Sequence, residues 1–148
     1  MATTTATITL ASSDILTDAL SVSATSTLYK DASTSTGLDQ VRMGRNEIAV
    51  GTTFDLLDAT AAGEDKSNWV YIANKETDET YYVIVTMYNK ALGRLYAGDW
   101  MYIPWGQGYG GGAGVRDDIE IEAFVGGPQT IEWICLHEGE TLSTQSDS

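Results

Sequence analysis

Residues 95–105 read Leu-Tyr-Ala-Gly-Asp-Trp-Met-Tyr-Ile-Pro-Trp, residues 106–114 contain six glycines, and residues 116–124 read Arg-Asp-Asp-Ile-Glu-Ile-Glu-Ala-Phe. The first segment predicts an aromatic β-strand that ends near Pro104, because proline cannot donate to a sheet ladder. The glycines predict a pliable loop. The last segment alternates between apolar and acidic side chains, which is typical of a half-buried strand. This stretch predicts an all-β domain.

Outward from this stretch, apolar alternation and turn residues recur at the spacing of roughly 8–12 residues that sandwiches and barrels show. Asn89-Lys90 predicts a tight hairpin turn, because asparagine tolerates a positive φ. Helical periodicity is almost absent, and Asp14–Leu20 is its best candidate. We predict a single jelly-roll-like antiparallel β-sandwich. Its strands after residue 46 are expected within Glu47–Leu57, Trp69–Ala73, Thr80–Tyr88, Ala91–Tyr96, Trp100–Ile103, Asp117–Val125 and Thr130–His137.

The first third of the chain is rich in Ser and Thr. Strands are expected at Ala6–Leu10 and Ser21–Tyr29, and residues 31–46 predict a long loop with a short edge strand at Gln40–Met43. The predicted organisation is an N-terminal Ser/Thr-rich arm or first strand at residues 1–12, a sandwich domain at 13–142 and a polar tail at 143–148.

The charge balance bears on the partners. Eight Lys and Arg face 21 Asp and Glu, which gives a net charge of −13 over 148 residues. The basic residues are scattered singly, whereas phosphate binding draws on clustered ones. We therefore expect neither nucleic acid nor an anionic membrane as a partner. No secretory leader and no apolar run near the ~20 residues of a membrane span is visible.

Cys135 and His137 are the only cysteine and the only histidine. Two positions apart on a strand, they share a face, which is the one feature in favour of a Cys–His dyad. Cys135 also lies on the apolar face of Ile131 and Trp133, however, where a thiol is usually inert. We predict no disulfide, no catalytic residue, no metal ligand and no cofactor, and expect that the protein is not an enzyme.

The spacing Gly106-x-Gly108-x-x-Gly111 matches the dinucleotide fingerprint, but that motif must open a helix, and an acidic strand follows here. We interpret the glycines as a loop that orders against a partner, with Tyr109 as its anchor. On the strand that follows, Asp118, Glu120 and Glu122 fall on one face at about 6.6–7 Å spacing. A solvated strand face is the favoured interpretation, and a weak Ca²⁺ site remains the alternative.

Aromatic side chains are the best candidates for function, because exposed aromatic patches mark interaction surfaces. Trp100 and Tyr102 should share one strand face, with Met101 and Ile103 on the other. The predicted interface consists of Trp100, Tyr102, Trp105, Tyr109, Gly110, Gly111 and Gly112.

Residues 69–75 (Trp-Val-Tyr-Ile-Ala-Asn-Lys) and residues 95–105 together resemble small virion proteins of tailed phages, most of all capsid decoration (cement) proteins. The stretch from Asp118 to the Thr130–Gly139 segment is similar to their closing hairpin. The resemblance covers residues 69–139. It implies a jelly-roll-like sandwich, often trimeric, that binds the major capsid protein on the outer surface of the assembled shell and stabilises the shell by mass action.

Two other classes remain open. A tail-tube or head–tail connector subunit would form rings and would need a long β-hairpin at the ring interface. A carbohydrate-binding sandwich of a tail fibre would use Trp100, Trp105 or Tyr109 as a sugar platform, and a coplanar exposed aromatic pair would favour it. For a decoration protein, we expect that deleting residues 1–12 weakens shell binding, and that Trp105→Ala and Tyr109→Ala reduce assembly without unfolding.

Overall fold

The computed structural model describes residues 4–15, 17–30, 33–57, 68–87, 89–105 and 118–137, and it contains ten β-strands and no helix within these ranges. The all-β prediction is confirmed. None of the described segments is a helix long and apolar enough to cross a membrane. The strands are β1 (Thr4–Ser12), β2 (Leu20–Leu28), β3 (Gln40–Ile48), β4 (Thr53–Leu57), β5 (Asn68–Asn74), β6 (Tyr82–Met87), β7 (Lys90–Tyr96), β8 (Trp100–Pro104), β9 (Ile119–Ala123) and β10 (Gln129–His137).

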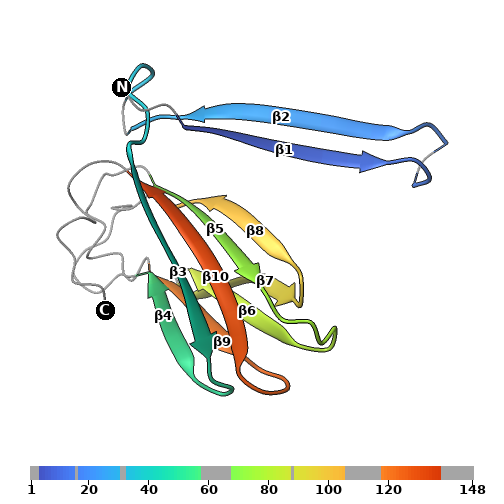
Figure 1. Ribbon diagram of the computed structural model, residues 1–148, viewed down its shortest axis with the longest axis vertical. Helices are drawn as coiled ribbons and strands as arrows, with labels where there is room; N and C mark the ends of the chain where they lie inside the picture. The colour runs from blue at the N-terminus through green and yellow to red at the C-terminus, as the bar shows by residue number, and fades with distance from the viewer. Residues whose placement is uncertain are drawn as a thin grey trace.

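Eight strands form two four-stranded antiparallel sheets, in the orders β3-β10-β5-β8 and β4-β9-β6-β7. Figure 1 shows the two sheets packed as a sandwich. The pairing is nested, since β6 pairs with β7, β5 with β8, β4 with β9 and β3 with β10. A long hairpin that is folded over on itself produces this order. The arrangement is compatible with the jelly roll expected from the sequence.

The core lies between the two sheets and follows the period of two in each strand. Ile119 and Ile121 of β9 are buried, as are Ile131, Trp133 and Cys135 of β10, while the residues that alternate with them are partly exposed. The alternation predicted for these two strands is confirmed. Burial of apolar area is the main driving force for packing two sheets face to face.

Two predicted turns have the backbone geometry that their residues favour. Asn89, between β6 and β7, has a φ of 56°, which asparagine tolerates better than most residues. Gly98, between β7 and β8, has a φ of 86°, where a Cβ would be strained. The Asn89-Lys90 turn and the Ala97–Asp99 turn are therefore supported by local chemistry.

A pair of buried amide side chains joins the sheets at one end. The Asn74 side-chain amide donates to the Leu95 carbonyl and to Gln129 Oε1, both at 3.0 Å. Gln129, which is fully buried, donates in turn to the carbonyls of Tyr82 at 2.9 Å and Val125 at 3.1 Å. Buried amides are tolerated because such bonds replace those lost to water.

Strand β3 is longer than the sequence suggested. The predicted edge strand stopped at Met43, but β3 runs from Gln40 to Ile48 and pairs with β10 over that whole length. This continuous ladder satisfies backbone groups that a loop would have left to water. Tertiary pairing thus extends the strand through a segment of low apolar content.

The N-terminal segment forms a hairpin that projects from the sandwich. β1 and β2 pair in register from Thr4–Leu28 to Ser12–Leu20 as a separate two-stranded sheet, and Figure 1 shows this ribbon extending past the body. The first strand, β1, ends at Ser12, and the projecting unit consists of β1 together with β2. Deleting residues 1–12 would remove one strand and leave β2 without its partner.

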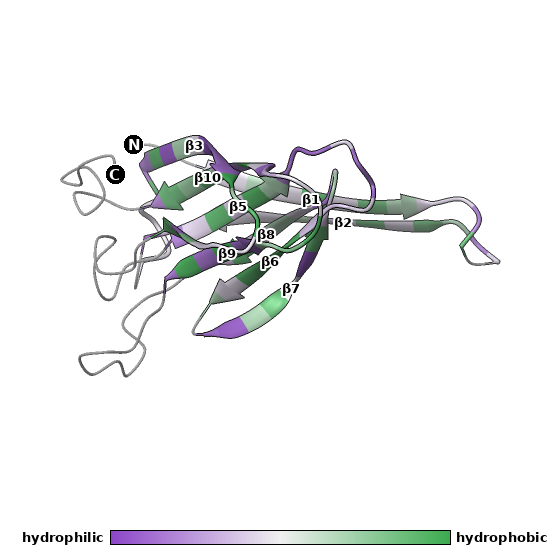
Figure 2. Ribbon diagram, turned by 90° about the horizontal axis from the view of Figure 1, so that it is seen from below, coloured by the Kyte–Doolittle hydropathy of each residue, from purple (hydrophilic) through white to green (hydrophobic). Residues whose placement is uncertain are grey.

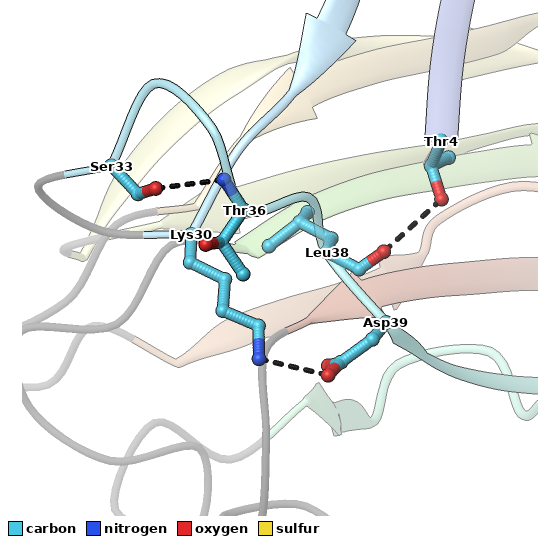
Figure 3. Close-up of polar contacts among 6 residues, drawn as sticks. All are labelled: Thr4, Lys30, Ser33, Thr36, Leu38 and Asp39. Atoms are coloured by element: carbon cyan, nitrogen blue, oxygen red, sulfur yellow. Dashed lines mark hydrogen bonds and ion pairs between the residues drawn. The ribbon is translucent and has the colours of Figure 1, made fainter. Parts of the chain in front are cut away.

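The base of the hairpin is fixed by the segment between β2 and β3 (Figure 3). Thr4 Oγ1 donates to the Leu38 carbonyl at 3.3 Å, and Leu38 N donates to the Leu28 carbonyl at 2.9 Å. Lys30 Nζ forms an ion pair with Asp39 Oδ2 at 2.8 Å. Leu28 and Leu38 are both buried. These contacts hold the base, whereas the rest of the hairpin relies on its own ladder.

Candidate functional site

The outer face of the β3-β10-β5-β8 sheet is unusually apolar for a surface. Its side chains form two cross-strand rows, because residues in register on antiparallel neighbours stand side by side. The charged pair Arg45 and Glu132, joined at 2.6 Å, lies in the next row and borders the apolar surface. We call these two rows the outer face. They consist of Val41, Leu136, Trp69 and Pro104, and of Met43, Ile134, Tyr71 and Tyr102.

Aromatic rings occupy the β5 and β8 side of the outer face. Trp69 stacks on Tyr102 with ring centroids 5.1 Å apart, and Tyr71 lies 6.0 Å from Trp100 at a tilt of 33°. Pairs of this kind add to the stability that area burial provides. Within the described part of the chain, no hydrogen-bond partner reaches the buried Tyr102 hydroxyl, and burial raises the pKa of Tyr102.

The β1-β2 hairpin has two chemically distinct faces. Ala6, Ile8 and Leu10 stand opposite Ser26, Ala24 and Val22 on one face, and the other face carries only Thr, Ser and Ala11. Neither strand contains an ionisable residue. In Figure 2 both strands lack the deep purple seen in parts of β3, β7 and β9. The hairpin is therefore an amphipathic ribbon without charge.

An open groove of about 300 Å³ separates the hairpin from the sheet. Residues 6–8 of β1 line one side, and Tyr71, Tyr102 and Ile134 are among the side chains that line the other. Apart from Thr7 and the tyrosine hydroxyls, the lining side chains are apolar or aromatic. A groove of this chemistry suits an apolar protein surface better than a ligand that must be hydrogen-bonded at many points.

The structure separates the residues of the predicted interface. Trp100 is 54% exposed and borders the groove, and Tyr102 lines it half-buried. Trp105 is fully buried within the core between the sheets, so its predicted role at an interface is wrong. Its backbone N donates to the Asn68 carbonyl at 2.7 Å, and its side chain lies on the same side of the strand as Met101 and Ile103, which pack on the core. Tyr109, Gly110, Gly111 and Gly112 lie outside the described residues.

Sequence analysis did not identify most of the groove. Tyr71, Ile134 and the β1 residues come from strands that are distant in the chain, and only long-range pairing brings them together. The available signal was the double alternation in residues 4–12 and 20–28. It places every large apolar side chain of each strand on a single face.

Cys135 and His137 are both buried, with exposures of 0% and 3%. Desolvation by burial raises the pKa of the Cys135 thiol to about 12, a shift that nearby Arg42 partly opposes. The thiolate is the nucleophilic form, so a raised pKa makes this cysteine unreactive at neutral pH. The prediction of an inert thiol has a direct chemical test.

In the native protein we expect almost no reaction of Cys135 with an aromatic disulfide reagent at pH 8. With a pKa near 12, only about one thiol in ten thousand is ionised at that pH. One equivalent should react after unfolding in guanidinium, which serves as the control. Rapid labelling of the folded chain would show that the thiol is accessible and ionised.

Three carboxylates approach one another at the edge of the second sheet. Ligand oxygens of Asp55, Asp118 and Glu120 all lie within 4.8 Å of one another. The sequence placed Asp118 and Glu120 together with Glu122, whereas Asp55 takes part because β4 pairs Asp55 with Glu120. Acidic groups gather in this way on many surfaces without binding an ion, so the cluster alone does not define a metal site.

Comparison of the chain with models of protein families, with curated proteins and with solved structures found no match. The geometry of the hairpin and the outer face is therefore the main guide to function.

Proposed function

We propose that this chain is a structural subunit of a virion, and specifically a capsid decoration (cement) protein. In this role it binds the major capsid protein on the outer surface of the assembled shell, acts as a homo-oligomer, expected to be a trimer, and performs no catalysis. The resemblance of residues 69–139 to such proteins supports this proposal. Binding only the assembled form of the shell would stabilise that form by mass action.

The observation that carries the proposal is the amphipathic hairpin. Leu10 and Val22 on its apolar face are 57% and 47% exposed, although the chain as a whole carries a net charge of −13. An apolar ribbon held away from a highly charged body gains free energy only when another surface covers it. Such an element is suited to assembly, because many copies on a lattice turn weak contacts into high avidity.

We expect that the purified chain co-sediments with empty shells of the virus that encodes it and raises their temperature of disassembly. It should bind unassembled capsid protein much more weakly, since the site is formed by several shell subunits. Sedimentation of the mixtures and light scattering on heating measure the two effects. A chain that leaves shell stability unchanged and stays in the supernatant would contradict the decoration role.

A tail-tube or head–tail connector subunit is the second candidate, and the same hairpin supports it. That class requires a long β-hairpin at a ring interface, and β1 and β2 pair over nine residues each. A connector would form closed rings without shells, whereas a decoration protein needs shells for its lattice. Negative-stain images of the isolated chain separate the two candidates.

A carbohydrate-binding role has less support. The most exposed aromatic ring beside the groove, Trp100, is tilted by 33° against Tyr71. Sugar platforms use rings that lie in one plane, with polar groups around them to fix the hydroxyls. The apolar lining of the groove provides few such groups.

A further inference from the structure

We infer that the distal half of the hairpin packs on the β3 side of the outer face of a second copy of this chain. The distal half comprises residues 8–12 of β1 and residues 20–24 of β2. The inference rests on the proposed role as a homo-oligomeric structural subunit, and it names the surfaces through which the copies meet.

Among the described residues, the contacts between the hairpin and its own body lie near the hairpin's base. Thr4 and Leu28 are held by contacts to Leu38, and the groove lining on β1 ends at Ile8. Beyond that point Leu10 and Val22, which are cross-strand partners, present apolar side chains to solvent. The distal half thus offers an apolar surface that its own sandwich does not cover.

The β3 side of the outer face also exposes apolar side chains, as the distal half of the hairpin does. Val41 is 56% exposed and Met43 is 65% exposed. A hollow of about 310 Å³ is lined by Met43 and its cross-strand partner Ile134, and the Arg45–Glu132 pair borders it. Aliphatic side chains such as those of Leu10 and Val22 match the chemistry of this surface.

The hairpin of the same copy does not reach this surface. Figures 1 and 2 show the ribbon running from its base away from β3 and past the β8 side of the body. Strands of nine residues span about 30 Å, so the tip lies beyond the edge of its own sandwich. A distal half that covers Val41 and Met43 must therefore come from another molecule.

Charge limits the surfaces through which two copies of the chain can meet. Two chains that each carry −13 repel each other, so their contact must use neutral or complementary surfaces. The hairpin strands and the two rows of the outer face contain no ionisable group other than tyrosine. A contact between these two surfaces therefore places no like charges together.

The first test changes one face of the hairpin at a time. Leu10→Asp with Val22→Asp alters the apolar cross-strand pair, and the matched control is Thr9→Asp with Ser23→Asp, the adjacent pair on the polar face. In sedimentation velocity we expect an oligomer for the original chain and the control, and a loss of affinity of more than about tenfold for the apolar-face variant. Met43→Asp should act likewise, with Leu92→Asp on the exposed edge strand β7 as its control.

The second test asks whether the contact is between molecules. A chain with Val22→Cys is mixed with a longer tagged chain with Met43→Cys under mild oxidation, while buried Cys135 stays unreactive. A disulfide that joins the two chains supports the inference. Three results overturn the inference. The first is a monomer at about 100 μM, and the second is an equal loss of oligomer affinity in the variants and their controls. The third is a disulfide that forms within a single chain when that chain carries both Val22→Cys and Met43→Cys.

Failure of this inference is distinguishable from failure of the decoration role. A monomer that still co-sediments with shells rejects the hairpin contact and the expected trimer, but leaves the decoration role in place. An oligomer that forms through Leu10 and Met43 but ignores shells confirms the contact and rejects decoration.

Discussion

Replacing Trp105 with alanine is expected to lower the free energy of unfolding by about 3–5 kcal/mol. The ring is fully buried among residues from both sheets, so its removal takes away apolar contacts and leaves a cavity that neighbours fill only in part. Since domains of this kind have about 5–15 kcal/mol of stability in total, the variant should unfold at a much lower urea concentration. Urea titration followed by far-UV circular dichroism measures the change.

Trp100→Ala is the matched control, because it removes the same side chain from a position that is 54% exposed. We expect a cost below about 1 kcal/mol for this variant. Equal stability of the two variants would contradict the burial of Trp105. A Trp105→Ala chain that keeps its stability but fails to assemble would restore the interface role that the sequence suggested.

Replacing Gln129 with leucine is expected to cost about 2–4 kcal/mol, although leucine is similar in size and apolar. The carbonyls of Tyr82 and Val125 each lose a donor that lies within 3.1 Å, and a buried polar group without its partner costs about 1–3 kcal/mol. Asn74 also loses its bond to Gln129 Oε1 but keeps the one to Leu95. Thermal unfolding of the variant should therefore show a clearly lower midpoint.

Gln40→Leu serves as the control, because Gln40 is an exposed glutamine at the start of β3. It should leave the midpoint within about one or two degrees of the original, since surface changes usually cost less than 0.5 kcal/mol. A Gln129→Leu chain as stable as the control would show that the amide pair does not hold the two sheets together.

Local patterns were sufficient for most of the strands. Ile119 and Ile121 alternate with acids, and that alternation alone predicts which face of β9 is buried. Asn89 predicts a turn because few other residues adopt its φ of 56°. Such features depend on neighbours in the chain, and the sequence therefore contains them directly.

Two kinds of feature were missed. The predicted strand ended at Ile103, so its alternation was not continued to Trp105, which lies on the core side with Met101 and Ile103. The partnership of β1 with β2 was also missed. Their connection has no two-residue turn signature such as Asn-Gly, so two strands were predicted without their ladder. The groove was not predicted either, because it lies between the hairpin and strands from the C-terminal half of the chain.

The nested pairing of the sandwich also has a consequence for the order of folding. β3 meets β10, which joins Gln40 to His137 across most of the chain, and contacts of such separation form slowly because a long loop must close first. The hairpin needs only local contacts and can form within about 1–10 μs. In each new chain the apolar hairpin therefore forms before the outer face of the sheet on which it is proposed to pack. The strong negative charge of the unfinished body then keeps neighbouring chains apart until the sheets are complete.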